Sequence, residues 1–292
     1  MDWLSALVHF RKNNTACVVV LITQVSGSAP RAAGTRMLVT QNEVHGTIGG
    51  GALELEGISH ARALMVCAAE GGNGVEHKGD KSDSLALVSC RQFNLAPELS
   101  QCCGGKVTLQ FDCHFKNDFI VHVFGAGHVA QEVARLVQRL PCVATFHDTR
   151  ADWLSQVSRL CERPDTSMSS GLHTKQIESS IFEHVESLDA RACFLVMTHS
   201  HEMDMDVVEA VLTRADAVYC GLIASESKAA KFRNRLKRKG FSEAEVARLN
   251  APLGQTIKTG NTPMEVAIAA MGDVLHARNQ VGTHTACHRT AP

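Results

Sequence analysis

The segment that most constrains the fold of this chain is a glycine turn between a strand and a helix. Residues 119–124 form an apolar run typical of a buried strand, and Gly125-Ala126-Gly127-His128-Val129-Ala130 follows it directly. This is the GxGxxA form of the dinucleotide fingerprint. Gly125 permits the tight turn, Gly127 lets the backbone approach a pyrophosphate, and Ala130 allows close packing of the helix on the strand. The free N–H groups of the new helix then favour a phosphate-bearing ligand.

A second strand places an acidic residue where such a fold uses one. Residues 142–147 are apolar and end at Asp148, about 20 residues after the turn, where a carboxylate can bind ribose hydroxyls. Residues 119–150 are therefore predicted to open a Rossmann-type domain. The alternative is that the glycine turn serves packing alone, without a phosphate site.

Strand and helix patterns alternate through the second half of the chain, which predicts a mostly parallel sheet. We expect an α/β protein with an N-terminal α+β domain at 1–115, a Rossmann-type domain at 119–278 and a disordered tail at 279–292. The strands expected in the second domain lie at 119–124, 142–147, 192–198 and 217–220. Its helices are expected at 129–140 and 205–213, with further starts near 225, 242 and 262, whereas 161–175 is expected to be loose.

The N-terminal domain contains a second glycine turn and a pair of adjacent thiols. A helix at 2–11 and strands at 16–25, 36–40, 84–90 and 106–113 are expected, with Gly49, Gly50 and Gly51 opening a helix at 52–69. Cys102 and Cys103 precede Gly104 in a turn whose amides can converge on an anion. Their soft thiolates suit a soft metal, although two adjacent cysteines do not complete a tetrahedral zinc site. An ordinary turn is the alternative.

Two further segments follow predicted strands and carry polar groups. His199 and His201, with Asp204, lie where ligands bind in open α/β sheets and could ligate a metal or exchange protons; a solvated loop is the alternative. The Gly221 loop opens a strongly basic helix that begins near Ser225 and holds Lys228 in its first turn. Such a helix is usually a solvated face, and the alternative is a docking surface for an acidic partner.

Composition restricts the function classes. The formal net charge of the 292 residues is -1, so no overall field attracts nucleic acid or an anionic membrane. We find no secretory signal and no membrane span, and we expect a cytoplasmic protein. The 11 cysteines are odd in number and include no CxxC pair, which argues against a disulfide framework. Hydrolase and phosphotransferase motifs are also absent from the sequence.

Taken together, these segments resemble the XdhC/CoxI family, the xanthine dehydrogenase accessory proteins, from about residue 15 to residue 276. The resemblance departs from the usual pattern at Ala224, where a glycine is common, and in the doubled Cys102-Cys103. The matching segments are Val25–Arg31 with Gly34; Gly46–Gly51 with Glu54; Cys103–Gly105; Gly125–Ala130 with Asp148 and Arg150; Thr198–His201 with Asp204; Gly221–Ile223; and Pro252–Gly254 with Pro263–Ala267.

The resemblance implies a molybdenum cofactor (molybdopterin) chaperone more than an enzyme. Such a chaperone holds the cofactor while a cysteine desulfurase supplies the sulfido ligand, and delivers it to the molybdenum subunit of xanthine dehydrogenase. We expect Cys103, or Cys102 in its place, to contact the molybdenum, and the Gly49 and Gly125 turns to bind phosphate. The expected cofactor-binding residues are Gly49, Gly50, Gly51, Glu54, Cys102, Cys103, Gly104, Gly125, Gly127, His128, Asp148, His199 and His201.

Two other functions fit parts of the sequence. An NAD(P)-dependent oxidoreductase would use the Gly125 turn and Asp148, with His199 and His201 as its acid–base site, but it explains only the second half of the chain. A Rossmann scaffold that binds protein partners without a cofactor would use the basic helix. The sequence leaves the oligomeric state open, with a homodimer among the alternatives.

Overall fold

The chain folds into two compact units, Met1–Lys116 and Asn117–Pro292. The computed structural model describes residues 1–69, 88–95, 105–160, 171–257 and 260–287. Within these residues, no helix combines the length and apolar character needed to cross a membrane.

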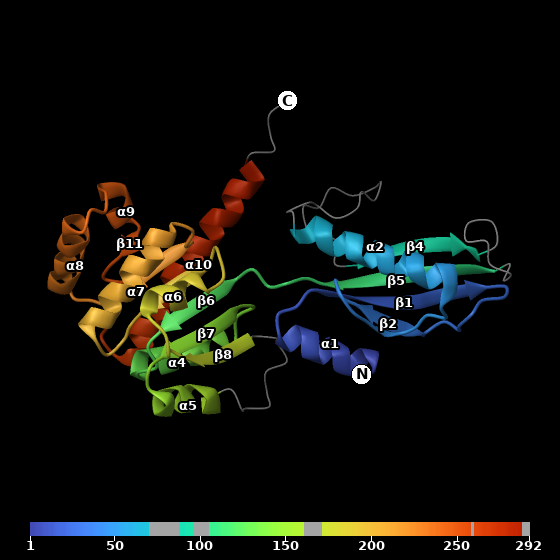
Figure 1. Cartoon of the computed structure of the whole chain (residues 1–292), viewed down its shortest axis with the longest axis horizontal. Coiled ribbons are helices and arrows are strands. Elements are labelled where there is room, and N and C mark those ends of the chain that lie inside the picture. The colour runs from blue at the N-terminus through green and yellow to red at the C-terminus, as the bar shows by residue number, and fades with distance from the viewer. Residues whose placement is uncertain (70–87, 96–104, 161–170, 258–259, 288–292) are drawn as a thin grey trace. The chain divides into compact units, whose positions relative to one another are not determined.

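Unit 1 is an antiparallel sheet with one helix on each face (Figure 1). The described sheet has the strand order β3-β2-β1-β5-β4. Its elements are α1 (Trp3–Lys12), β1 (Cys17–Ser26), β2 (Arg36–Val39), β3 (Val44–Gly46), α2 (Gly51–Ala69), β4 (Val88–Asn94) and β5 (Lys106–His114).

The alternation of side chains along β1 explains why both faces of this sheet are covered. Val18 and Val20 point to the core beneath α2, whereas Cys17 and Val19 point to the smaller core beneath α1. Helix α1 begins at Trp3, one residue after the expected start, because Asp2 is its N-cap: the Asp2 carboxylate accepts hydrogen bonds from the amides of Leu4 and Ser5 at 3.0 and 3.1 Å.

Unit 2 is a Rossmann domain, as predicted, with a parallel sheet in the order β11-β10-β9-β6-β7-β8. Helices α4, α5 and α10 pack on one face, and α6, α7, α8 and α9 on the other. Its elements are β6 (Ile120–Phe124), α4 (His128–Val137), β7 (Val143–Asp148), α5 (Ala151–Leu160), β8 (Gly171–Gln176), α6 (Ile181–Glu186), β9 (Cys193–Val196), α7 (His201–Arg214), β10 (Tyr219–Leu222), α8 (Glu226–Arg238), α9 (Glu243–Ala247), β11 (Leu249–Asn250) and α10 (Pro263–Cys287).

The strand order reverses direction at β6, which pairs with β7 on one side and with β9 on the other. Loops that leave neighbouring strands at such a point run to opposite faces of the sheet and leave a crevice between them. In unit 2 the loops at this switch point follow Phe124 and Val196.

Three expectations differ from the structure. Strand β4 begins at Val88, so it overlaps the strand expected at 84–90 only at its end, and 84–87 lie outside the described residues. Strand β8 occupies part of the segment expected to be loose; it is an edge strand with one large apolar residue, Leu172, and so gives little hydrophobic signal. Helix α10 continues to Cys287, into the tail expected to be disordered, since no proline interrupts it.

Candidate functional site

The glycine turn after β6 forms one side of the switch-point crevice. Gly125 has φ +114°, and a Cβ on it would lie 2.3 Å from the carbonyl oxygen of Met197, at the start of the loop after β9. Only glycine fits there, because both the backbone conformation and the space exclude a side chain. The Gly125 amide also donates to the carbonyl of His147 at 2.7 Å, so the turn is fixed on both of its neighbouring strands.

Gly127 has the opposite surroundings. A Cβ on Gly127 would meet no atom within 4 Å, and its φ of -70° is open to any residue. Gly127 is the N-cap residue of α4, and no side chain caps the amides that follow it. The exposed His128 ring packs edge-on against Trp153, 5.5 Å between ring centroids. An uncapped helix end beside open space can accept a phosphate.

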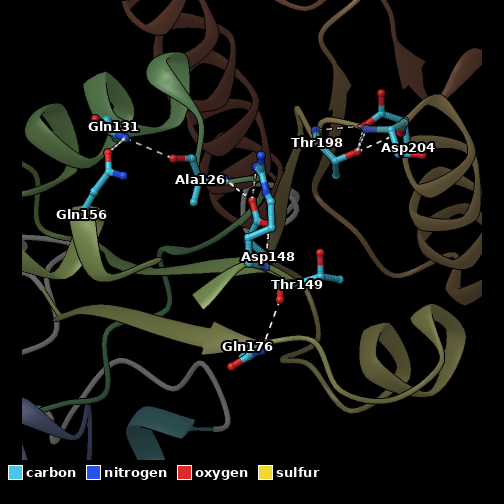
Figure 2. A network of polar contacts seen from close by, with 10 residues as sticks. Ala126, Gln131, Asp148, Thr149, Gln156, Gln176, Thr198 and Asp204 are labelled. Carbon is cyan, nitrogen blue, oxygen red and sulfur yellow. Dashed lines mark hydrogen bonds and ion pairs between the residues drawn. The ribbon is translucent and has the colours of Figure 1, made fainter. Parts of the chain in front are cut away.

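Asp148 lies at the carboxyl end of β7 and anchors the glycine turn from below (Figure 2). Its Oδ2 accepts from the Ala126 amide at 2.9 Å and from Arg150 Nη2 at 2.8 Å, while its Oδ1 accepts from the Arg150 amide at 3.0 Å and from Arg150 Nε at 2.9 Å. Burial alone would raise the pKa of Asp148, but hydrogen bonds from the Arg150 side chain, the Arg150 amide and Ala126 hold it below its ordinary value. Asp148 is 2% exposed.

A second buried carboxylate fixes the loop after β9. Asp204 is 0% exposed and accepts from the amide and hydroxyl of Thr198 at 2.9 and 2.7 Å. Lys228, at the start of α8, donates to it at 2.7 Å and to the Ile223 carbonyl at 3.1 Å. Asp204 is therefore a structural anchor between two loops, with its charge balanced by lysine.

The same loop leaves its two histidines exposed. His199 and His201 lie at the start of α7, while Asp204 points inward to Thr198 and Lys228. Among the residues that the structure describes, no group of three or more His, Cys, Asp or Glu side chains could hold a metal ion. Asp204 is engaged by Thr198 and Lys228, so it does not join the two histidines in a metal site, which was one of the alternatives that the sequence left open.

A third anchoring carboxylate was not predicted from the sequence. Asp273 of α10 accepts from the amides of Gly254, Gln255 and Thr256 at 2.7, 3.2 and 3.0 Å, and from the Tyr219 hydroxyl at 3.0 Å. These contacts hold the loop that follows β11 against the last helix. No local pattern reveals them, because 17 to 19 residues separate Asp273 from the amides.

Three buried histidines link β6, β7 and α6 beside the Gly125 turn. His147 lies 3.1 Å from His122 and 2.9 Å from His184, nitrogen to nitrogen, and its ring stacks on Phe124. Burial lowers the pKa of His122 to about 4 and that of His147 to about 2, and it also lowers the pKa of His184. The chain of rings is therefore neutral at neutral pH.

The glycine turn of unit 1 binds a carboxylate of the same unit. Glu54, in the first turn of α2, accepts hydrogen bonds from the Thr47 hydroxyl and from the amides of Ile48 and Gly50, the last two at 3.0 Å. Burial alone would raise the pKa of Glu54, but these donors lower it. The amides that were expected to bind phosphate already hold a carboxylate of the chain.

The thiols of the predicted metal contact, Cys102 and Cys103, lie outside the described residues, as does Gly104. Gly105 is described, and a Cβ on it would lie 2.2 Å from the Ser28 carbonyl oxygen. A Cβ on Gly49 would lie 2.5 Å from Pro30 Cβ. The segment from Ser28 to Pro30 therefore packs directly on two other glycine motifs, and the structure brings three separate sequence motifs together at one end of the sheet.

Most described cysteines are unreactive core residues. Burial raises the pKa of the Cys17 and Cys113 thiols to about 11 and that of Cys142, Cys193 and Cys220 to about 12. All the described cysteines are free thiols.

The basic helix α8 and its C-cap residue Lys239 form ion pairs within unit 2. Lys228 pairs with Asp204, Lys237 with Glu243, and Lys239 with Glu209. The Lys237–Glu243 pair is exposed and contributes little to stability, whereas the Lys228–Asp204 pair is buried.

The comparisons with known proteins agree with this division of the chain. Residues 121–274, more than half of the chain, match the model described as the XdhC Rossmann domain, and residues 10–77 match the XdhC and CoxI family. The chain is 25% identical over 280 residues to the uncharacterized protein YqeB of Escherichia coli (strain K12). That alignment covers 96% of this chain and 47% of YqeB, so the chain spans about half the length of this relative. A crystal structure named as a xanthine dehydrogenase from Bacillus halodurans is 14% identical, with a TM-score of 0.44 over 96% of both chains.

Proposed function

The chain belongs to the XdhC and CoxI family, and from this premise we propose that it carries a molybdenum cofactor to the molybdenum subunit of xanthine dehydrogenase. Membership of the family indicates an accessory role to that enzyme. The proposal adds that the chain binds the cofactor itself, holds it while a cysteine desulfurase supplies the sulfido ligand, and then releases it.

The observation that carries the proposal is the open end of α4. The cofactor is a pterin that bears a phosphate and a dithiolene-bound metal. The uncapped amides after Gly127, beside space that no atom occupies within 4 Å, fit the phosphate. The turn is rigid, because Gly125 packs on Met197 and the Ala126 amide is held by Asp148, so a ligand meets a preformed cradle.

The metal end of the cofactor calls for a soft ligand, and we assign this role to Cys103. When bound, the cofactor supplies the molybdenum and its sulfido group. Gly105, the second residue after Cys103 in the sequence, packs against Ser28.

The buried acids of unit 2 favour a carrier over the alternative NAD(P)-dependent oxidoreductase. Asp148, Asp204 and Asp273 all accept hydrogen bonds from backbone amides and from cations or hydroxyls of the chain. An oxidoreductase of this fold would use the carboxylate after the second strand for ribose and would need an acid–base group near the substrate. The anchoring of these acids suits a protein that binds without reacting.

A binding experiment tests the proposal. The purified protein is mixed separately with molybdopterin cofactor, NADH and NADPH, and co-elution and fluorescence are measured. We expect the molybdenum cofactor to co-elute and Cys103→Ala to weaken its binding and transfer. Binding of a nicotinamide dinucleotide alone would overturn the proposal, and full cofactor binding and transfer by Cys103→Ala would remove the thiol from it. Cys90→Ala, which removes an exposed thiol on β4, is the matched control.

A further inference from the structure

Asp148 stands where nucleotide-binding folds place the carboxylate that binds the ribose, and in this chain its acceptor sites are already occupied. A carboxylate offers about four lone-pair sites to donors. Asp148 accepts four hydrogen bonds, one from Ala126 and three from Arg150, and it is buried. No acceptor site is left for a ribose diol, which needs two.

Arg150 is held in place by more than its carboxylate. Its guanidinium lies 5.0 Å from the centroid of the Trp153 ring, a cation–π contact on the first turn of α5. Its Nε and Nη2 both donate to Asp148 in the bidentate geometry that makes arginine–carboxylate pairs strong. To bind Asp148, a diol would have to displace the Arg150 side chain. It would also compete for Oδ2 with the Ala126 amide, whose hydrogen bond orders the glycine turn.

We infer that the Asp148–Arg150 pair closes the ribose position beside the Gly125 turn, so that a ribose diol gains no hydrogen bond from Asp148 and a nucleotide has no advantage there over other phosphate esters. This inference rests on the proposed function for the phosphate cradle. It assigns the class of ligand: a phosphorylated heterocycle is accepted, and an adenosine dinucleotide loses its ribose contact through residues of the chain rather than through lack of a suitable turn.

The first test needs no variant. Calorimetric titration of the protein with AMP and with 2′-deoxy-AMP compares two ligands that differ only in one hydroxyl of the diol. We expect both to bind equally weakly or neither to bind, because Asp148 does not read the hydroxyl. A preference for AMP of about tenfold or more would overturn the inference, since it would show that Asp148 is available to ribose.

The second test opens the position. Arg150→Ala removes two of the four donors, Nε and Nη2, and leaves the amides of residues 126 and 150. Two acceptor sites on Asp148 become free, and we expect NADH to bind at least about tenfold more tightly than to the unmodified protein. Adding Asp148→Asn to this variant should abolish the gain, because the acceptor of the diol is then lost. Arg159→Ala, which removes an exposed arginine from α5, the helix that follows Arg150, is the charge-matched control and should not change NADH binding.

Other outcomes have distinct meanings. If Arg150→Ala is folded, as judged by its thermal transition, and shows no gain in NADH binding, the pair does not guard the crevice. If the unmodified protein binds NADPH tightly and Arg150→Ala loses that binding, the arginine is a ligand for a 2′-phosphate and the inference fails. Titration of the same proteins with molybdenum cofactor is read separately, so a failure of cofactor carriage leaves the nucleotide result standing.

Discussion

The two glycine turns of this molecule resemble each other in sequence and differ in what their amides do. In unit 1, the turn at Gly49–Gly51 surrounds the carboxylate of Glu54, which accepts hydrogen bonds from the amides of Ile48 and Gly50. In unit 2, the turn at Gly125–Gly127 gives one amide, that of Ala126, to Asp148 and leaves the start of α4 without a side-chain cap. A glycine turn before a helix is therefore a phosphate site only when no nearby carboxylate of the chain already occupies its amides.

The largest effect should come from filling the rigid end of the second turn. We expect Gly125→Ala to lower the free energy of unfolding by about 3 to 4 kcal/mol, since the new Cβ clashes with the Met197 carbonyl and the residue must keep a positive φ. Thermal denaturation measures the loss. A change below about 1 kcal/mol would mean that the turn can move away from β9, and the two turns would then differ less in rigidity than we describe.

Acid should act on the second turn through the buried histidines. In the unfolded chain His122 binds a proton below its ordinary pKa of 6.5, whereas in the folded chain burial delays this to about pH 4. The unfolded state therefore holds more protons between these values, and stability falls as the pH falls from 6.5 to 4, by up to about 3 kcal/mol from this residue. Denaturant titrations at several pH values should show this slope reduced in His122→Gln, with exposed His199→Gln as the control.

The first turn should depend on its carboxylate. We expect Glu54→Ala to cost about 2 kcal/mol, because the amides of Ile48 and Gly50 lose a charged acceptor. Glu56→Ala, on the exposed face of α2, is the matched control and should be near neutral. If Glu54→Ala is equally stable and gains affinity for inorganic phosphate, the carboxylate occupies an anion site, and the contrast between the turns would be one of occupancy alone.

The smallest change in stability should accompany a clear change in binding. Gly127→Ala adds a methyl group to open space at an ordinary φ, so the free energy of unfolding should change by less than about 0.5 kcal/mol. The same methyl group blocks close approach to the α4 amides, and we expect the phosphate-bearing cofactor to bind about tenfold more weakly. Gly50→Ala, whose Cβ would also meet nothing within 4 Å, is the control for binding in the first turn and should leave cofactor binding unchanged, although its φ of +74° makes alanine there costlier in stability than at Gly127.

The sequence predicted those features that depend on local patterns. The apolar run at 119–124 and the small residues after it give the β6–α4 turn, and the capping box of Ser242 and Glu245 gives the start of α9. Strand β8 was missed because an edge strand buries little and its residues are mostly polar. The family was also predicted correctly, since its motifs are short and contiguous.

The contacts that decide what each motif does were not predictable in the same way. Glu54 alone gave a local signal, an acid in the first turn of a helix, which favours a contact with the preceding amides. The pairing of Asp204 with Lys228 depends on two strands that lie side by side only in the folded sheet. The roles expected for Asp148 and for the Gly49 turn followed from residue type. The structure shows that Asp148 already accepts hydrogen bonds from Ala126 and Arg150, and that amides of the Gly49 turn already donate to Glu54.

The hydrogen bonds that Asp273 accepts tie the final helix to the loop that precedes it in the chain. A fragment cut before Asp273 would still contain residues 251–256 and every motif of the crevice, yet the amides of Gly254 to Thr256 would have lost their only charged acceptor in the described structure. The practical boundary of this domain is thus set by a side chain rather than by its last strand. Any shortened or transplanted version must extend beyond residue 273 to keep the loop after β11 in place.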